Sequence, residues 1–186
     1  MSKTVRNVRG IILVACGLAF GCAGNDPVAY SDFDPEADFS TYRTFAFISA
    51  HPLVMTTIDQ GNPALEGYLM EEVKAYLTGR GFQYVSRKAD ADFVIGFASG
   101  SQDTLNAAVY SGTYDHHIYW GRIRGTQVAL QGGTEAGLVI DIFDQASARK
   151  KWMGWASGEM TMADEIELQE TVRDIVPVIL ASFPPD

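Results

Sequence analysis

The stretch from Gly137 to Gly158, GLVIDIFDQASARKKWMGWASG, constrains the fold more than any other part of the sequence. Leu138 to Phe143 is apolar and rich in β-branched residues, which is typical of a strand buried on both faces. Asp144 to Lys151 is polar and ends in three basic residues, as expected of a solvated loop. Trp152 to Ser157 returns as a second strand. The stretch therefore predicts two strands, joined by a polar loop, around which the sheet is built.

Asp141 is the one acid inside the apolar strand, and its role has two interpretations. The first is a catalytic acid or a ligand, although a lone carboxylate without a second acid, a histidine or a metal is not a mechanism. The second is an outward-facing position near a sheet edge, or a carboxylate bonded to a neighbouring loop. In the returning strand, Gly154 leaves room for a bulge or for an aromatic ring folded over the strand.

Composition favours one globular domain and argues against several partners. The chain has 186 residues, of which 47% are hydrophobic, and a net charge of −9. A chain of this size buries roughly 70% of its unfolded surface. Nucleic-acid binding requires a basic stripe, and anionic lipid surfaces attract basic segments. The acidic balance therefore argues against nucleic acid and against electrostatic attachment to lipid. No stretch after residue 21 is apolar for long enough to span a membrane.

The N-terminus reads as an export signal. Three basic residues precede a short apolar core from Gly10 to Gly21, which is the pattern of a secretory signal peptide. Ala19-Phe20-Gly21-Cys22 resembles the lipobox of bacterial lipoproteins, although Ala19 stands where leucine is usual. Leu13 to Cys16 fits the lipobox better locally but leaves a shorter apolar core, so we favour Cys22 over Cys16 as the lipidated residue. An ordinary signal peptide with an incidental cysteine is the third interpretation.

The predicted organisation is a signal peptide at residues 1–21, a lipidated cysteine and tether at 22–31, and one domain at 32–186. Several acyl chains on Cys22 would supply the two or more hydrophobic signals that stable anchoring needs. Cleavage removes three basic residues and no acid, which takes the net charge from −9 to −12. By resemblance to the lipoprotein sorting rule, Ala23 implies the outer membrane, facing the periplasm. The tether Ala23 to Ser31 spans at most about 30 Å, which predicts a domain close to that membrane.

The rest of the chain predicts further strands and two helices. The strands are expected at Tyr42–Ile48, Phe82–Ser86 and Phe93–Ala98. Asn62-Pro63 opens a helix that ends at Gly79 and Gly81. A second helix begins near Asp164, with acids in its first turns and an apolar stripe from Val172 to Phe183. The predicted fold class is α+β: a two-layer sandwich with a mostly antiparallel β-sheet and two helices packed on one face.

The segment from Gly100 to Thr134 is rich in Gly, Ser, Thr and Tyr, and it predicts either a long hairpin or an irregular loop. Its aromatic residues either grip a partner or, more commonly, pack on the sheet. The candidate partner-binding residues are Tyr110, Tyr114, Tyr119 and Trp120. His116-His117 is a poor metal site, because adjacent strand residues face opposite ways and His51 is the only other histidine. We expect no metal, cofactor or catalytic residue.

Five stretches of the sequence match one family pattern. They are Asp34-Pro35 with 37–40 and 42–47, the helix 62–81, Ala91-Asp92-Phe93, residues 137–144 with 152–155, and Phe183-Pro184-Pro185. On these stretches the chain resembles the small bacterial envelope lipoproteins of the domain of unknown function 4136 family. Members have no established activity, so the resemblance implies no catalytic residues.

Two classes of function follow from these observations. The first is a lipid-anchored envelope protein that is not an enzyme and works as a binding or assembly module. Its partners would be the membrane, through the acyl chains, and another envelope protein or a cell-wall component. The alternative is a periplasmic hydrolase acting on a cell-wall or small-molecule substrate, with Asp141, Glu159 and His116 or His117 as candidate groups.

Overall fold

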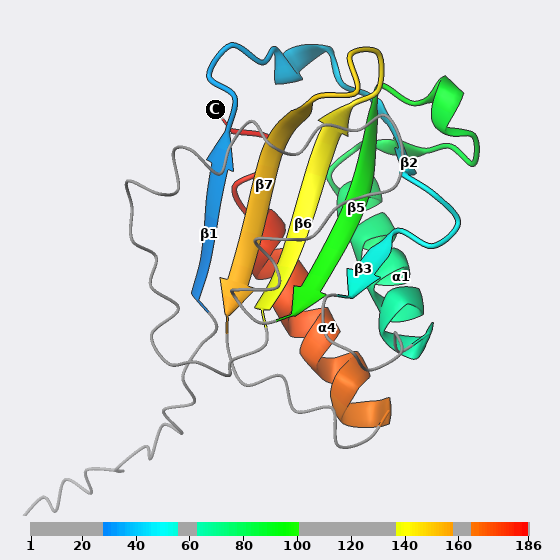
Figure 1. Ribbon diagram of the computed structural model, residues 1–186, viewed down its shortest axis with the longest axis vertical. Helices are drawn as coiled ribbons and strands as arrows, with labels where there is room; N and C mark the ends of the chain where they lie inside the picture. Colours follow the sequence, from blue (N-terminus) through cyan, green and yellow to red (C-terminus); the bar gives the residue numbers. More distant parts are fainter. Residues whose placement is uncertain (1–27, 56–62, 101–136, 158–164, 186) are drawn as a thin grey trace, which may run out of the picture.

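The computed structural model describes residues 28–55, 63–100, 137–157 and 165–185, and one β-sheet lies at its centre (Figure 1). Within these residues seven strands join in the order β1-β7-β6-β5-β2-β4, with β3 paired to β5. The strands are β1 (Val28–Phe33), β2 (Thr44–Phe47), β3 (Leu53–Met55), β4 (Gln83–Tyr84), β5 (Phe93–Gly100), β6 (Gly137–Asp144) and β7 (Lys150–Ser157). Short 3-10 turns lie at Phe39–Thr41 and Lys88–Asp90.

The four long strands are antiparallel, and three short strands join them in parallel. β6 pairs with β7 as the predicted hairpin, and β5 and β1 lie antiparallel on either side of it. β2 runs parallel to the first half of β5 and β3 to its second half, while β4 runs parallel to β2. The predicted α+β class with a mostly antiparallel sheet is confirmed. β2 and β4 lie within the predicted strands Tyr42–Ile48 and Phe82–Ser86, whereas β3 was not predicted, because three residues are too few for an alternating pattern.

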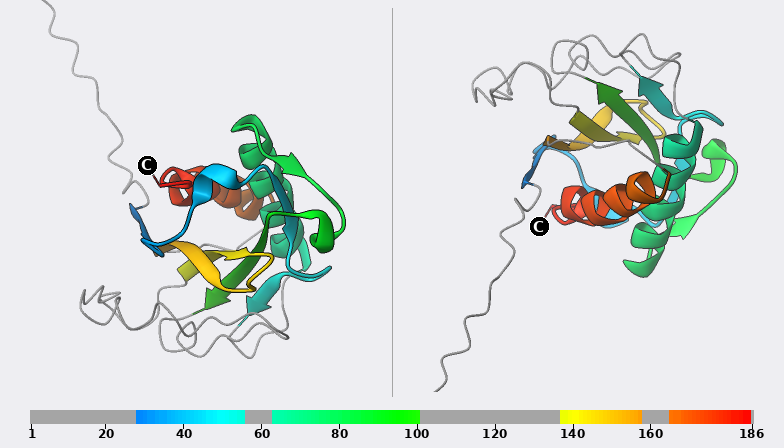
Figure 2. Two further views of the ribbon diagram at one scale, coloured as in Figure 1. Left: turned by 90° about the horizontal axis from the view of Figure 1, so that it is seen from above. Right: turned by 90° about the horizontal axis from the view of Figure 1, so that it is seen from below.

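Both helices cover one face of the sheet, as predicted (Figure 2). α1 (Pro63–Gly79) and α4 (Glu165–Leu180) turn their apolar stripes toward the strands. The buried helix residues are Leu65, Leu69, Val73, Leu77, Leu168, Val172, Ile175, Val176, Ile179 and Leu180. They share one core with the side chains of the sheet that point the same way, which are Phe45, Phe47, Phe93, Ile95, Phe97, Leu138, Ile140, Ile142, Trp152 and Ala156.

Of the two glycines expected to end the first helix, Gly79 is the last residue of α1 and Gly81 supplies the left-handed conformation after it. Gly81 has a φ of 94°, in the left-handed region that favours glycine. Its N–H donates to the Thr78 carbonyl over 3.0 Å, and the N–H of Phe82 donates to the Leu77 carbonyl over 3.1 Å. These two bonds form a Schellman motif, which satisfies carbonyls that the helix end would leave open. The motif turns the chain so that Phe82 packs against the core.

The predicted boundary between tether and domain is wrong. Val28 to Ser31 belong to β1, which pairs with β7 from Val28 opposite Ser157 to Phe33 opposite Trp152. The sequence does not predict this strand, because it lies at the edge of the sheet and each of its two faces carries both apolar and polar residues. The sheet therefore begins closer to Cys22 than the sequence indicated.

Gly154 makes room for the Trp152 ring. This is the second of the two roles that the sequence predicted for it, a bulge or an aromatic ring folded over the strand. A Cβ atom at position 154 would lie 2.2 Å from Cη2 of Trp152 and 2.7 Å from Cγ2 of Ile179. Both neighbours are buried and cannot swing aside. We expect Gly154→Ala to destabilise the protein by about 1–3 kcal/mol or more, as overpacked cores do. Chemical denaturation measures this.

Gly67 supplies the control for that variant. It lies inside α1, and a Cβ atom there would meet nothing within 4 Å. Gly67→Ala should therefore stabilise the protein by about 0.5–1 kcal/mol, through helix propensity alone. Equal effects at the two glycines would show that the Trp152 ring does not limit position 154.

Asp92 ties the start of β5 to the start of β2. Its Oδ2 accepts the backbone N–H groups of Arg43 and Thr44, each over 2.8 Å, and the Thr44 hydroxyl over 3.0 Å. Burial raises the pKa of the Asp92 carboxyl, but these hydrogen bonds outweigh it and hold the pKa below its usual value. The carboxylate therefore stabilises the fold above the unfolded pKa of about 3.9, and this contribution is lost as the pH falls through the folded pKa.

We expect Asp92→Asn to lower stability at neutral pH, because the amide accepts these bonds more weakly than a carboxylate. Below the folded pKa the native carboxyl is protonated, so wild type and variant should converge there. Urea denaturation at a series of pH values tests this. Curves that stay parallel down to strongly acidic pH would contradict the assignment.

Candidate functional site

The candidate site lies on the face of the sheet opposite α1 and α4, which we call the distal face. Side chains alternate along a strand, so the residues between those of the helix-side core point this way. The apolar ones form two clusters separate from that core: Ala46, Ile48, Ala91, Val94 and Phe143 in one, and Ala98, Val139 and Met153 in the other. Asp141 of β6 shares this face with its neighbours Val139 and Phe143.

A buried ion pair lies among these apolar residues. Nζ of Lys150 is 2.8 Å from Oδ1 of Asp141, and the two side chains are 1% and 4% exposed. Nζ also lies 4.0 Å from Sδ of Met153 and 5.6 Å from the centre of the Phe143 ring. Oδ1 has no partner of hydrogen-bond geometry among the described residues, so charge attraction carries the contact. Each charge makes burial of the other tolerable.

A β-bulge brings Lys150 to this face. Ile142 pairs with Trp152, but Phe143 pairs with Lys150, which leaves Lys151 as the extra residue. Strict alternation from Trp152 would have put Lys151 on the distal face. The bulge exchanges the two lysines, since two residues of one strand then oppose a single residue of the other. Lys151 instead reaches Asp34, with Nζ 2.8 Å from Oδ2.

Two expectations from the sequence are therefore corrected. Lys150 and Lys151 are not part of a solvated loop, because β7 begins at Lys150 and that side chain is buried. Asp141 is not near a sheet edge, because β6 lies between β7 and β5 and the side chain is 3% exposed. One signal could have found the pair: an acid in one apolar strand of a hairpin requires a cation, and the other strand begins with two lysines.

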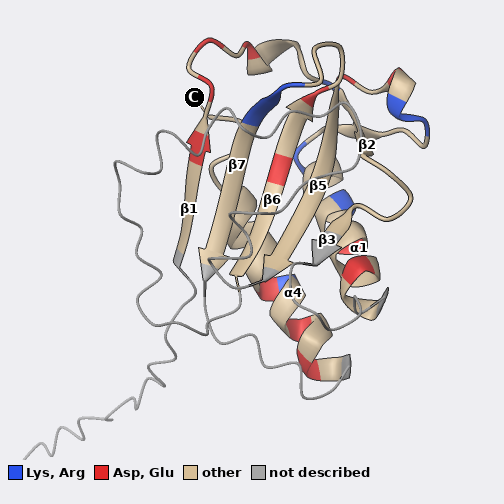
Figure 3. Ribbon diagram, viewed as in Figure 1, with Lys and Arg blue, Asp and Glu red and all other residues tan. Residues whose placement is uncertain are grey.

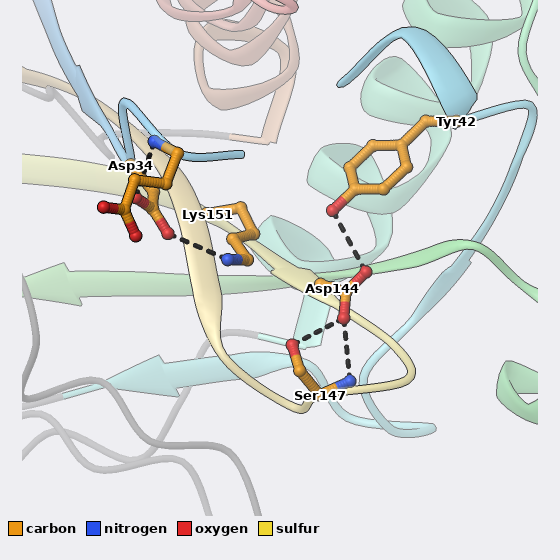
Figure 4. Close-up of polar contacts among 6 residues, drawn as sticks. Asp34, Tyr42, Asp144, Ser147 and Lys151 are labelled. Carbon is orange, nitrogen blue, oxygen red and sulfur yellow. Dashed lines mark hydrogen bonds and ion pairs between the residues drawn. The ribbon is translucent and has the colours of Figure 1, made fainter. Parts of the chain in front are cut away.

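Polar contacts brace the closed end of the hairpin (Figure 4). The N–H of Asp34 donates to the Lys151 carbonyl over 2.8 Å, beside the ion pair of the same residues. The Tyr42 hydroxyl donates to Oδ2 of Asp144 over 3.3 Å, and the N–H of Ser147 donates to Oδ1 over 2.7 Å. Burial, and next the charge of Asp144, raise the pKa of Tyr42 well above its usual value. Tyr42 therefore remains a donor at physiological pH, and these groups fix the loop.

A stacked pair of aromatic rings lies at the edge of the distal face. The rings of Tyr30 and Trp155 stack with centroids 5.7 Å apart and planes inclined by 25°. They are register partners of β1 and β7, and Tyr30 is 45% exposed. The sequence does not predict this pair, because it places Tyr30 in the tether. The pairing of β1 with β7 is what brings the two rings together.

Most of the candidates named from the sequence lie outside the described residues. These are Cys22, Tyr110, Tyr114, His116, His117, Tyr119, Trp120 and Glu159. His51 is exposed, with Nδ1 3.4 Å from Oε1 of Glu66. Across 28–55, 63–100, 137–157 and 165–185, no three His, Cys, Asp or Glu side chains group as metal ligands. In the same ranges no helix has the length and apolar character to cross a membrane.

The described residues define an α+β fold, with α1 and α4 on one face of a mixed sheet and a buried acid–lysine pair on the other. The model of the domain of unknown function DUF4136 matches residues 29–185, so the chain belongs to that family. No curated protein matches the sequence.

Several solved structures are similar in fold, and two of them are described here. A DUF4136 family protein from Bacteroides thetaiotaomicron is 12% identical, with a TM-score of 0.57, over 86% of this chain and 97% of that one. A PDZ domain protein from Parabacteroides distasonis is 18% identical, with a TM-score of 0.51, over 87% of this chain and 37% of that one. The second match thus spans only part of its protein, and both describe the fold alone.

Proposed function

We propose that this member of the DUF4136 family is a lipid-anchored protein of the cell envelope that works as a non-enzymatic binding or assembly module. The observation that carries the proposal is the N-terminus: a basic start, a short apolar core and Cys22 directly precede a domain whose first strand begins at Val28. Ala23 after the cysteine favours the outer membrane, with the domain in the periplasm. The family itself has no known function.

The start of β1 shortens the tether and strengthens this proposal. Only residues 23–27 separate Cys22 from Val28, and five residues span at most about 17 Å. An anchored domain would therefore stay at the membrane surface. A partner would have to come to that surface, since the domain could not reach across the periplasm.

The state of Asp141 supports a binding role over the hydrolase alternative. Its carboxylate is almost inaccessible to solvent and is paired with Lys150. A general acid or base has to reach its substrate. A carboxylate that is closed off from solvent and held by a lysine cannot do so. The pair therefore works as a structural element of the sheet. We infer that a partner binds at another surface of the protein.

The anchor is tested by the intact mass of the protein extracted from separated inner and outer membranes. We expect cleavage before Cys22, added acyl chains and recovery in the outer membrane. Cys22→Ser should lose the acyl chains, and Cys16→Ser should keep them. A soluble wild-type protein without acyl chains would contradict the anchor, and loss of acylation in Cys16→Ser alone would place it at the other cysteine.

The binding role is tested by deleting residues 105–130, which include Tyr110, Tyr114, Tyr119 and Trp120. The design uses the register of the sheet: Gly100 and Gly137, which flank the segment, are partners across β5 and β6. Residues 101–104 and 131–136 remain to join two strand ends that already lie side by side. We expect an envelope partner that co-purifies with the anchored wild type to be lost from a deletion variant with unchanged unfolding. Retention of that partner would contradict a role for this segment.

A further inference from the structure

We propose that the stacked rings of Tyr30 and Trp155 rest in the headgroup region of the bilayer that holds the acylated Cys22. This inference rests on the proposed lipid anchor and adds a second membrane contact, made by the folded domain itself. It assigns one end of the distal face, beside the first strand, to the lipid surface.

The position of Tyr30 in the chain is the first support. It is the third residue of β1, and β1 begins five residues after Ala23. With the tether and two strand residues fully extended, Tyr30 lies within about 27 Å of Cys22. β1 also forms one edge of the sheet, so no described strand covers its outer side. The ring pair is therefore held near the membrane surface by covalent reach.

The chemistry of the pair is the second support. Tyrosine and tryptophan combine an apolar ring with a polar O–H or N–H group, and they concentrate where hydrocarbon meets water at a bilayer surface. Tyr30 is 45% exposed although it stacks on Trp155, so the two rings present one amphipathic surface. Without a contact to a bilayer or a partner, this apolar area would remain in solvent.

The distribution of charge is the third support. The residues that adjoin the pair, Val28 to Ser31 of β1 and Trp155 to Ser157 of β7, carry no charge (Figure 3). The charged residues of β1 and the following turn begin at Asp32, toward the far end of the strand. The acidic residues of α1 and α4 belong to the helix layer on the other side of the sheet. Contact through the Tyr30 end therefore keeps the acids of α1 and α4 away from anionic headgroups, and Asp32 is then the nearest acid of β1.

The test is quenching of tryptophan fluorescence by brominated lipid. The acylated full-length mature protein is reconstituted into phosphatidylcholine vesicles whose acyl chains carry bromine near the headgroup. Trp152 is fully buried on the helix side, so it should not be quenched. We expect quenching in the wild type, loss of most of it in Trp155→Phe, and no loss in Trp120→Phe. Quenching that survives in Trp155→Phe, or that disappears in Trp120→Phe, would overturn the proposal.

A matched pair of variants on β1 separates the two faces. Tyr30 and Phe33 are both exposed aromatic residues of this strand, but Phe33 points to the helix side and its ring lies against Phe39. Tyr30→Ser should reduce the quenching of Trp155, and Phe33→Ser should not. Equal effects would overturn the assignment of the distal face to the bilayer.

The intact mass of each sample distinguishes this inference from the proposed function. If acyl chains are present and Trp155 is not quenched, the anchor stands and the headgroup contact is refuted; a protein partner then becomes the occupant of the patch. If the chain carries no acyl groups, the proposed anchor fails and the headgroup contact falls with it.

Discussion

Replacing Lys150 with methionine should destabilise the protein by about 3–5 kcal/mol, because it leaves the Asp141 carboxylate buried without its cation. The two side chains are 1% and 4% exposed, and their charged atoms are 2.8 Å apart. Methionine has nearly the length of the aliphatic part of lysine, so the change removes the charge with little loss of packing. Urea denaturation measures the change in the free energy of unfolding.

The neighbouring lysine provides the control. Lys151 also makes a 2.8 Å ion pair, with Asp34, but these side chains are 18% and 16% exposed. Lys151→Met should therefore cost only about 0–1 kcal/mol, as partly solvated pairs do. Similar costs at both positions would contradict the view that burial makes the Lys150 contact important.

The variants Asp141→Leu and Asp141→Leu/Lys150→Met complete a thermodynamic cycle with Lys150→Met. With both charges gone, the apolar neighbours on the distal face can pack against apolar side chains, and stability should return close to that of the wild type. Recovery would show that the pair contributes little net stability. A double variant as unstable as Lys150→Met would instead indicate that the strands need the ion pair itself.

Replacing Phe183 with alanine should destabilise the protein by about 3–5 kcal/mol, comparable with other buried phenylalanines. The residue follows α4 and is fully buried. Its ring contacts four others at centroid distances of 5.4–5.9 Å, which belong to Phe39, Phe82, Phe93 and Trp152. These rings come from four separate segments, so the truncation would leave a cavity at the place where they meet.

Ser182 is the matched control for Phe183. It is exposed, and its hydroxyl donates to the Ser31 hydroxyl over 2.8 Å. Ser182→Ala should change the free energy of unfolding by about 0.5 kcal/mol or less, as surface substitutions do. Thermal unfolding of both variants makes the comparison. A Phe183→Ala variant that unfolds like Ser182→Ala would show that the aromatic cluster does not depend on this ring.

The two largest effects concern opposite faces of the sheet. Phe183 closes the core between sheet and helices, whereas Lys150 neutralises a charge on the distal face. If both predictions hold, each face of the sheet contains a side chain whose loss costs about 3–5 kcal/mol. The distal face is then a surface whose apolar residues surround a fixed pair of charges and end in the Tyr30–Trp155 stack.

The sequence alone determined the elements whose signals are local. The apolar run of β6, the stripe of α4 from Val172 to Leu180 and the glycine that ends α1 could all be predicted, because each depends on neighbours within a few residues. The α+β class followed from the order of these elements. The role of Gly154 beneath a tryptophan ring was one of two local interpretations, and the structure selects it.

Only the tertiary structure decided which residues meet across the sheet. β1 is an edge strand without an apolar pattern, so its pairing with β7 could not be read, and the Tyr30–Trp155 stack depends on that pairing. The bulge at Lys151 exchanges two adjacent lysines between environments, and a shift of one residue reverses which side chain is buried. The register between strands is set only in the assembled sheet. For that reason Lys150, which was predicted to lie in a solvated loop, supplies the buried cation.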